Sequence, residues 1–165
     1  MKRFFIGLLL LTLMALPLPA ARKALVIGNA AYAESPLRNP VNDAQAVESL
    51  LKGLGFETTL RVNQDKRGLE QVLDSFAASL QPVDEVVFYY SGHGAQVEGE
   101  NFLIPVGKVM NDEADVKYDG VSANKATEKL SLAAVSIVVL DACRDNAYRG
   151  IRSGNKGLAL MPTSL

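Results

Sequence analysis

Residues 84–94 read Asp-Glu-Val-Val-Phe-Tyr-Tyr-Ser-Gly-His-Gly, and this stretch decides the fold. Its first half is apolar, β-branched and aromatic, and it has the length of a buried strand. The small residues from Ser91 to Gly94 predict a flexible turn, which carries His93, the only histidine in the sequence. A strand that ends here delivers an imidazole to the carboxyl edge of a sheet, where open α/β sheets bind their ligands.

Strand-like and helix-like segments alternate around this stretch. Further buried strands are predicted at 23–29, 56–62 and 135–140, and helices are predicted at 43–53, 66–80 and 123–130. Asn42 or Asp43 is the expected N-cap of the first helix. A small hairpin is predicted at 96–104 with its turn at Gly99-Glu100, and residues 107–120 read as a polar loop. The alternation predicts an α/β fold with a mainly parallel sheet covered by helices on both faces.

The composition is that of one ordinary globular domain. The chain has 165 residues, of which 48% are hydrophobic and 21% are charged, and its formal net charge is −1. This length is ample for one core and leaves little room for a second domain. Because the sequence has no basic stripe or tail, we expect no nucleic-acid partner.

The first 21 residues read as a secretory signal peptide, which leaves one domain at 22–165. Met1-Lys2-Arg3 is basic, Phe4–Leu16 is apolar, and Pro17–Ala20 ends in small residues. The alternative is an uncleaved N-terminal anchor, but the apolar core is shorter than the roughly 20 residues that a spanning helix needs. We therefore expect an exported protein, either periplasmic or secreted. The only cysteine, Cys143, is then paired between molecules, buried and inert, or reactive.

Two predicted strands end close to reactive side chains. Tyr90 leads to His93, and Leu140 leads to Cys143. If the strands are parallel neighbours, imidazole and thiol form a dyad in which the imidazole assists thiolate formation and later protonates a leaving amine. The glycines beside His93 would let a substrate backbone approach. The amide N–H groups of Gly94 and Cys143 are the expected oxyanion donors, since both lie at strand ends.

Each of these residues also has a purely structural interpretation. A single cysteine is often a small buried hydrophobe, and a single histidine can be an ordinary loop residue. The fact that the only histidine and the only cysteine both follow buried strands favours a site.

The two motifs, Ser91-Gly92-His93-Gly94 and Asp141-Ala142-Cys143-Arg144-Asp145, are separated as the histidine and cysteine motifs of caspases are. Together with the stretches 24–29, 39–43, 101–105 and 157–159, they make residues 22–160 resemble the caspase-like clan of cysteine peptidases. The resemblance is to the bacterial metacaspase-like members called orthocaspases. It implies a caspase-like three-layer sandwich, with His93 as general base and acid and Cys143 as nucleophile.

The resemblance also implies an acidic specificity pocket formed by Asp43, Ser91 and Asp141. Two carboxylates would favour a cationic side chain, so the expected substrates are proteins or peptides cleaved after Arg or Lys. Alternatively, Asp43 only caps a helix, and Asp141 only caps the turn after its strand.

Four further expectations concern the rest of the chain. Some metacaspases need calcium, but the acidic residues between Asp112 and Asp119 match no calcium loop, so no cofactor or metal is assigned. In this family further core strands follow the position of residue 159, so we expect the C-terminal strands of the sheet to be missing here. A partner or a missing segment would then complete the sheet.

Basic residues from Arg149 to Lys156 suggest self-cleavage. A catalytically silent caspase-like interaction module, a fragment inactive without its small-subunit strands, and a ligand-binding α/β domain are the alternatives.

Overall fold

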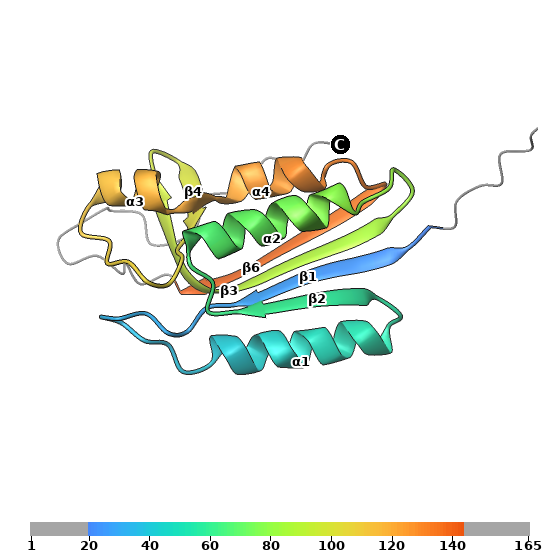
Figure 1. The fold of residues 1–165 in the computed structure, drawn as a ribbon, viewed down its shortest axis with the longest axis horizontal. Helices are drawn as coiled ribbons and strands as arrows, with labels where there is room; N and C mark the ends of the chain where they lie inside the picture. The colour runs from blue at the N-terminus through green and yellow to red at the C-terminus, as the bar shows by residue number, and fades with distance from the viewer. Residues whose placement is uncertain (1–19, 144–165) are drawn as a thin grey trace, which may run out of the picture.

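The computed structural model describes residues 20–143, which form one mixed α/β domain (Figure 1). The strands are β1 (Arg22–Gly28), β2 (Glu57–Val62), β3 (Glu85–Val97), β4 (Glu100–Leu103), β5 (Val121–Ser122) and β6 (Val135–Cys143). The helices are α1 (Pro40–Gly53), α2 (Lys66–Ala78), α3 (Glu113–Asp119) and α4 (Ala123–Leu130).

The long strand β3 lies at the centre of the sheet. Its first part pairs in parallel with β1 on one side and with β6 on the other, and β1 pairs in parallel with β2. Its last part turns into an antiparallel hairpin with β4, which in turn pairs with β5. The mainly parallel sheet that the alternating pattern predicts is therefore confirmed, with a small antiparallel extension.

Helices cover both faces of this sheet, with α1 on one side and α2 and α4 on the other (Figure 1). Alternate strand residues divide between the two sides because successive side chains in a strand point to opposite faces. Leu25, Phe88 and Tyr90 pack in the larger core with α2 and α4. Val26 and Val87 pack with residues of α1 in the smaller core.

The structure corrects several element boundaries. Ser91, Gly92 and His93 do not form a turn, because β3 continues without interruption to Val97. Strand β6 likewise runs to Cys143 instead of ending at residue 140. The continuation is possible because residues 91–93 pair in register with residues 141–143. Tertiary pairing thus overrides the low strand preference of these small residues.

The N-cap of α1 and the hairpin turn also differ from the predictions. Asn39 is the N-cap and Pro40 begins α1, so neither Asn42 nor Asp43 caps the helix. Proline favours the first helical position because its fixed φ fits a helix and its missing N–H is not needed there. The hairpin turn lies at Glu98-Gly99, where both residues have positive φ (51° and 82°), as a tight two-residue hairpin turn requires.

A helix also replaces part of the predicted loop at 107–120. The Asp112 side chain caps α3 by accepting a hydrogen bond of 2.9 Å from the amide of Asp115. The neighbouring helix α4 spans the residues that its helical period predicts. Within residues 20–143, no helix has the length and apolar character needed to cross a membrane. Residues 1–19 of the predicted signal peptide lie outside this range.

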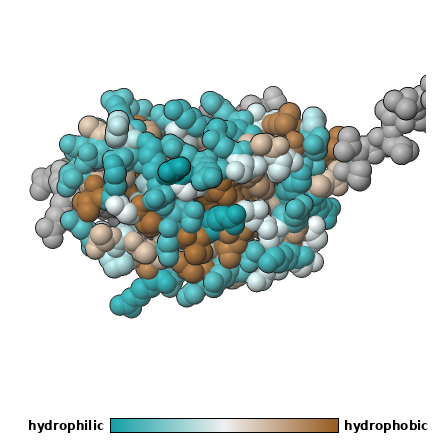
Figure 2. Space-filling model, in the orientation of Figure 1, coloured by the Kyte–Doolittle hydropathy of each residue, from teal (hydrophilic) through white to brown (hydrophobic). Residues whose placement is uncertain are grey.

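Strand β6 leaves one apolar face uncovered. The side chains of Val135, Ile137 and Val139 are 50%, 53% and 41% exposed. Their register partners in β3 include Val87 and Tyr89, which are buried on the α1 side of the sheet. Helix α1 thus covers that face over β1 to β3, and none of the helices in residues 20–143 covers it over β6. In the view of Figure 2 the molecular surface is mostly hydrophilic, with separate apolar patches.

Candidate active site

His93 and Cys143 are register partners on adjacent parallel strands, β3 and β6. The chain therefore brings its only histidine and its only cysteine to neighbouring positions, as the sequence motifs predict. The backbone of Cys143 belongs to the described strand. The side chain of Cys143 is not among the parts that the structure describes. Arg149, Arg152 and Lys156, in the predicted self-cleavage segment, also lie outside the described residues.

The imidazole of His93 is buried, with 6% of the residue exposed. Its Nε2 atom lies 2.8 Å from the carbonyl oxygen of Ser35, in the loop between β1 and α1. A carbonyl oxygen can only accept, so Nε2 carries the hydrogen and Nδ1 has a free lone pair. Among the described residues, Nδ1 is buried without a hydrogen-bond partner. The ring is thus held in the tautomer that a general base at Nδ1 requires.

Two tyrosine hydroxyl groups surround the backbone next to His93. Tyr32 accepts a hydrogen bond of 2.9 Å from the His93 amide, and Tyr90 donates one of 2.9 Å to the His93 carbonyl. A side chain at Gly92 would place its Cβ 2.7 Å from both hydroxyl oxygens. Gly92 therefore makes room for these tyrosines.

Gly94 lies opposite Leu103 at the start of the β3–β4 ladder. The neighbouring bond in this ladder, from the Ile104 amide to the His93 carbonyl, measures 3.0 Å. In an antiparallel ladder this makes Gly94 and Leu103 a pair without mutual hydrogen bonds. The Gly94 N–H therefore points away from β4, towards the β6 side of the strand, where an oxyanion donor would be needed.

Ser91 and Asp141 lie two residues before His93 and Cys143, again as register partners on β3 and β6. The Ser91 hydroxyl donates to Asp141 Oδ2 at 3.4 Å. Ser91 is buried, whereas Asp141 is exposed. Since Asp141 lies within β6, it does not cap a turn, and that alternative is wrong.

Tyr89 belongs to the same cluster, although sequence reasoning did not select it. Its hydroxyl donates to Asp141 Oδ2 at 3.0 Å. Burial, followed by the hydrogen bond to Asp141, raises the pKa of Tyr89 to about 12. The signal that could have found it is the strand period, because Tyr89 precedes Ser91 by two residues and shares its face.

Asp43 lies in the first turn of α1 and is half-buried. Its charge contributes to the raised pKa of Tyr89, so the carboxylate is within electrostatic reach of the cluster. In the described part of the chain its carboxylate has no hydrogen bond or ion pair. The three predicted pocket residues thus lie around Tyr89, with one carboxylate bound and one free.

The acidic residues between 112 and 119 are occupied in local structure. Asp112 caps α3, Asp119 pairs with Lys108 at 2.8 Å, and Asp115 accepts bonds from the amide and side chain of Asn111. These bonds from Asn111 lower the pKa of Asp115. Over residues 20–143, no group of three or more acidic, histidine or cysteine side chains is arranged to hold a metal ion.

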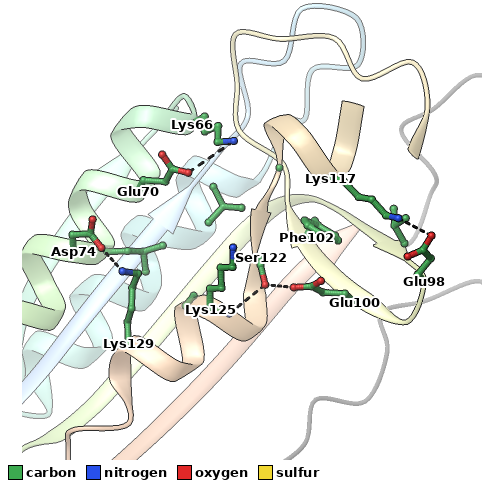
Figure 3. Close-up of a pocket in the computed structure, with 15 residues that line it drawn as sticks. Lys66, Glu70, Asp74, Glu98, Glu100, Phe102, Lys117, Ser122, Lys125 and Lys129 are labelled. Carbon is green, nitrogen blue, oxygen red and sulfur yellow. Dashed lines mark hydrogen bonds and ion pairs between the residues drawn. The ribbon is translucent and has the colours of Figure 1, made fainter. Parts of the chain in front are cut away.

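A separate groove lies away from these residues, between α2, α4 and the β3–β4 hairpin (Figure 3). It encloses about 630 Å³ and is lined by lysines and acids. Most of these charges neutralise one another: Lys117 pairs with Glu98 at 2.6 Å, and Lys129 pairs with Asp74 at 2.5 Å. A small hollow of about 30 Å³ adjoins His93. His93 does not line the groove, so the candidate site is placed at the paired residues of β3 and β6.

Comparison with known proteins identifies the family. A family model described as the caspase domain matches residues 21–159. Human mucosa-associated lymphoid tissue lymphoma translocation protein 1 is 32% identical over 91 residues, which are 54% of this chain and 11% of that protein. Metacaspase-1 of Candida albicans is also 32% identical over 91 residues, which are 48% of this chain and 20% of that protein.

A solved protein of Geobacter sulfurreducens has a similar fold, with a TM-score of 0.56 and 17% identity over 73% of this chain and 48% of that protein. The matched region thus spans a fifth or less of the curated relatives and about half of the structural one. The mixed sheet, the two helical layers and the match over most of the chain agree: this protein belongs to the caspase domain family, a family of cysteine peptidases.

Proposed function

We propose that the protein is a cysteine endopeptidase in which His93 and Cys143 form the catalytic dyad. The observation that carries the proposal is the register of the two residues on neighbouring strands. The orientation of the imidazole adds to it, since Nε2 is bound to the Ser35 carbonyl and Nδ1 is left with a free lone pair. A base in this state can accept the thiol proton from a cysteine beside it.

In the proposed reaction, Nδ1 of His93 takes the thiol proton and the thiolate of Cys143 attacks the scissile carbonyl carbon. The N–H groups of Gly94 and Cys143 stabilise the resulting oxyanion. The imidazolium gives its proton to the leaving amine as the C–N bond breaks, which leaves a thioester on Cys143. A water molecule, deprotonated by His93, then hydrolyses the thioester and restores the free thiol.

We propose that substrates carry Arg or Lys before the scissile bond. Asp43 and Asp141 supply two negative charges near Ser91, and neither carboxylate is neutralised by a cation among residues 20–143. A bound guanidinium can pair with carboxylates through two parallel hydrogen bonds, which favours Arg. The same preference would direct self-cleavage to the basic segment from Arg149 to Lys156.

We further propose that another strand completes the sheet at β6. This strand pairs only with β3 in the described part of the chain, and its Val135, Ile137 and Val139 side chains are exposed on one face. An unpaired edge with an apolar face is prone to pair with another strand. The strand would come from a partner or a further segment, and size-exclusion chromatography with light scattering tests for a second copy. The proposed location remains outside the cytoplasm, on the basis of residues 1–21.

One experiment separates an active peptidase from a silent caspase-like module. Fluorogenic peptides ending in Arg, Lys or Asp are incubated with the purified protein and with Cys143→Ala. Turnover of the Arg and Lys peptides that disappears in the variant supports the proposal. Turnover of no peptide favours the silent module, and preference for the Asp peptide would contradict the acidic pocket.

A further inference from the structure

We infer that Tyr32 is the positioning residue of His93, because one side chain fixes both the backbone and the ring of this histidine. The inference deepens the proposed function and rests on it for its catalytic consequence. It starts from a break in the pairing of β3. On one edge of β3, the pairing with β1 ends at Ser91, which lies opposite Gly28, and the pairing with β4 starts at Gly94.

His93 lies between these two ladders. Its carbonyl reaches the β4 side, where it accepts from the Ile104 amide at 3.0 Å. Its buried N–H has no strand partner at this point, and a buried N–H must be paired. The Tyr32 hydroxyl accepts this hydrogen at 2.9 Å and donates its own to the Ile104 carbonyl at 3.0 Å. Tyr32 thus replaces a missing strand residue and ties His93 to the end of β4.

The ring of Tyr32 also contacts the imidazole. The two ring centroids are 4.3 Å apart and the planes are inclined by 55°. Tyr32 belongs to the same loop as Ser35, whose carbonyl holds Nε2 of His93. The loop therefore contacts the histidine at three points: the amide, the ring face and Nε2. Together these contacts fix the direction in which Nδ1 points.

The residues packed around Tyr32 leave space for its hydroxyl group beside the backbone of His93. The Tyr32 and Tyr90 hydroxyl oxygens lie 3.2 Å apart above Gly92, where any Cβ would collide with both. Tyr32 is 7% exposed and Tyr90 is fully buried. Tyr32 does not touch the reacting atoms, so it acts through His93 and not as a catalytic residue.

The single histidine makes the inference directly measurable. Protein labelled with [15N]histidine gives one imidazole signal set and one histidine amide, so NMR reports the tautomer and the amide hydrogen exchange of His93. We compare Tyr32→Phe, which removes only the hydroxyl, with Tyr32→Leu, which also removes the ring. Tyr118→Phe is the matched control, because Tyr118 is 76% exposed. Leu73→Ala, on the core-facing side of α2, controls for loss of stability alone.

We expect wild-type protein to show only the tautomer with hydrogen on Nε2. In Tyr32→Phe the His93 amide should exchange at least about tenfold faster, because its acceptor is gone. In Tyr32→Leu both tautomers should be populated. On an Arg peptide, Tyr32→Phe should lower kcat about tenfold with KM within about twofold, since orientation affects the chemical step more than binding. Both controls should keep the wild-type tautomer.

The outcomes separate this inference from the proposed function. If Tyr32→Phe and Tyr32→Leu leave the tautomer and the amide exchange unchanged, the inference is wrong, even for an active peptidase. If Leu73→Ala changes the tautomer as Tyr32→Leu does, the effect is one of stability and the inference is equally wrong. If the wild-type protein cleaves no peptide but the NMR changes occur, the proposed function fails and the positioning of His93 by Tyr32 stands.

Discussion

His93 and Cys143 are register partners on the adjacent parallel strands β3 and β6. Neighbouring strands lie about 4.8 Å apart, so the two residues start from backbone positions one strand spacing apart. Rigid strands give such a pair a more exact position than loops do. Because the chain has one histidine and one cysteine, the coupling between them can be measured without substrate.

The first prediction concerns the reactivity of the Cys143 thiol. A free cysteine has a pKa of about 8.5, so little thiolate is present at mildly acidic pH. We expect iodoacetamide to alkylate Cys143 in the wild-type protein at about pH 6.5 at least about tenfold faster than in His93→Ala, because the imidazole takes up the thiol proton. The reaction is followed by intact mass. Equal rates in the two proteins would show that no dyad forms.

The central strands and both functional motifs could be predicted because they depend on local sequence. The apolar runs of β1, β3 and β6 and the helical period of α4 are visible without a structure. The continuation of β3 through Ser91 to His93 could not be predicted, because these residues become a strand only by pairing with 141–143. Tyr32 was missed for the same reason: its contacts with His93 span 61 residues of sequence.

The second prediction concerns Asp43, the free carboxylate of the proposed pocket. Asp43→Asn should lower kcat/KM for an Arg peptide by about 10- to 100-fold, mainly through KM, because a charged hydrogen bond to the substrate is lost. Asp74→Asn is the matched control, since Asp74 lies on α2 and pairs with Lys129. A variant that keeps wild-type kcat/KM would remove Asp43 from the pocket.

The third prediction concerns Tyr89 and its hydrogen bond to Asp141. Tyr89→Phe keeps the ring and removes the donor, so Asp141 loses one of the two hydroxyl groups that hold it. We expect KM for Arg peptides to rise about 3- to 10-fold with kcat unchanged. Because the pKa of Tyr89 is raised to about 12, the hydroxyl stays protonated and the ratio between variant and wild type should not change across the neutral pH range. A change in kcat alone would contradict this assignment.

The fourth prediction concerns Gly92. Gly92→Ala would bring a Cβ within 2.7 Å of the Tyr32 and Tyr90 hydroxyl oxygens. Tyr90 is fully buried and cannot move aside, so we expect a loss of about 1–3 kcal/mol in unfolding free energy from overpacking. Gly53→Ala is the control, because a Cβ there meets nothing within 4 Å. The measurement is urea unfolding of both variants. A Gly92→Ala protein as stable as the wild type would show that the tyrosine pair is mobile.

The fifth prediction concerns stability in acid. Asp84, at the start of β3, is 1% exposed; it pairs with Lys23 at 2.9 Å and accepts bonds from the amides of Gln81 and Ala21. The ion pair with Lys23 is the main cause of the lowered pKa of Asp84. A carboxyl whose pKa is lower in the folded state stabilises the protein above its ordinary value of about 3.9. This stabilisation is lost as the pH falls through the lower, folded-state pKa.

Asp84→Asn should therefore be less stable than wild type at neutral pH, and the difference should shrink below about pH 4. Glu85→Gln is the control from the next residue, because its exposed pair with Arg22 should contribute only about 0–1 kcal/mol. Thermal unfolding from about pH 2.5 to about pH 8 measures both differences. A difference between Asp84→Asn and wild type that grows as the pH falls would have the wrong sign for a lowered pKa. A difference that stays the same over the whole pH range would mean that Asp84 anchors the start of β3 through hydrogen bonds that do not depend on its charge.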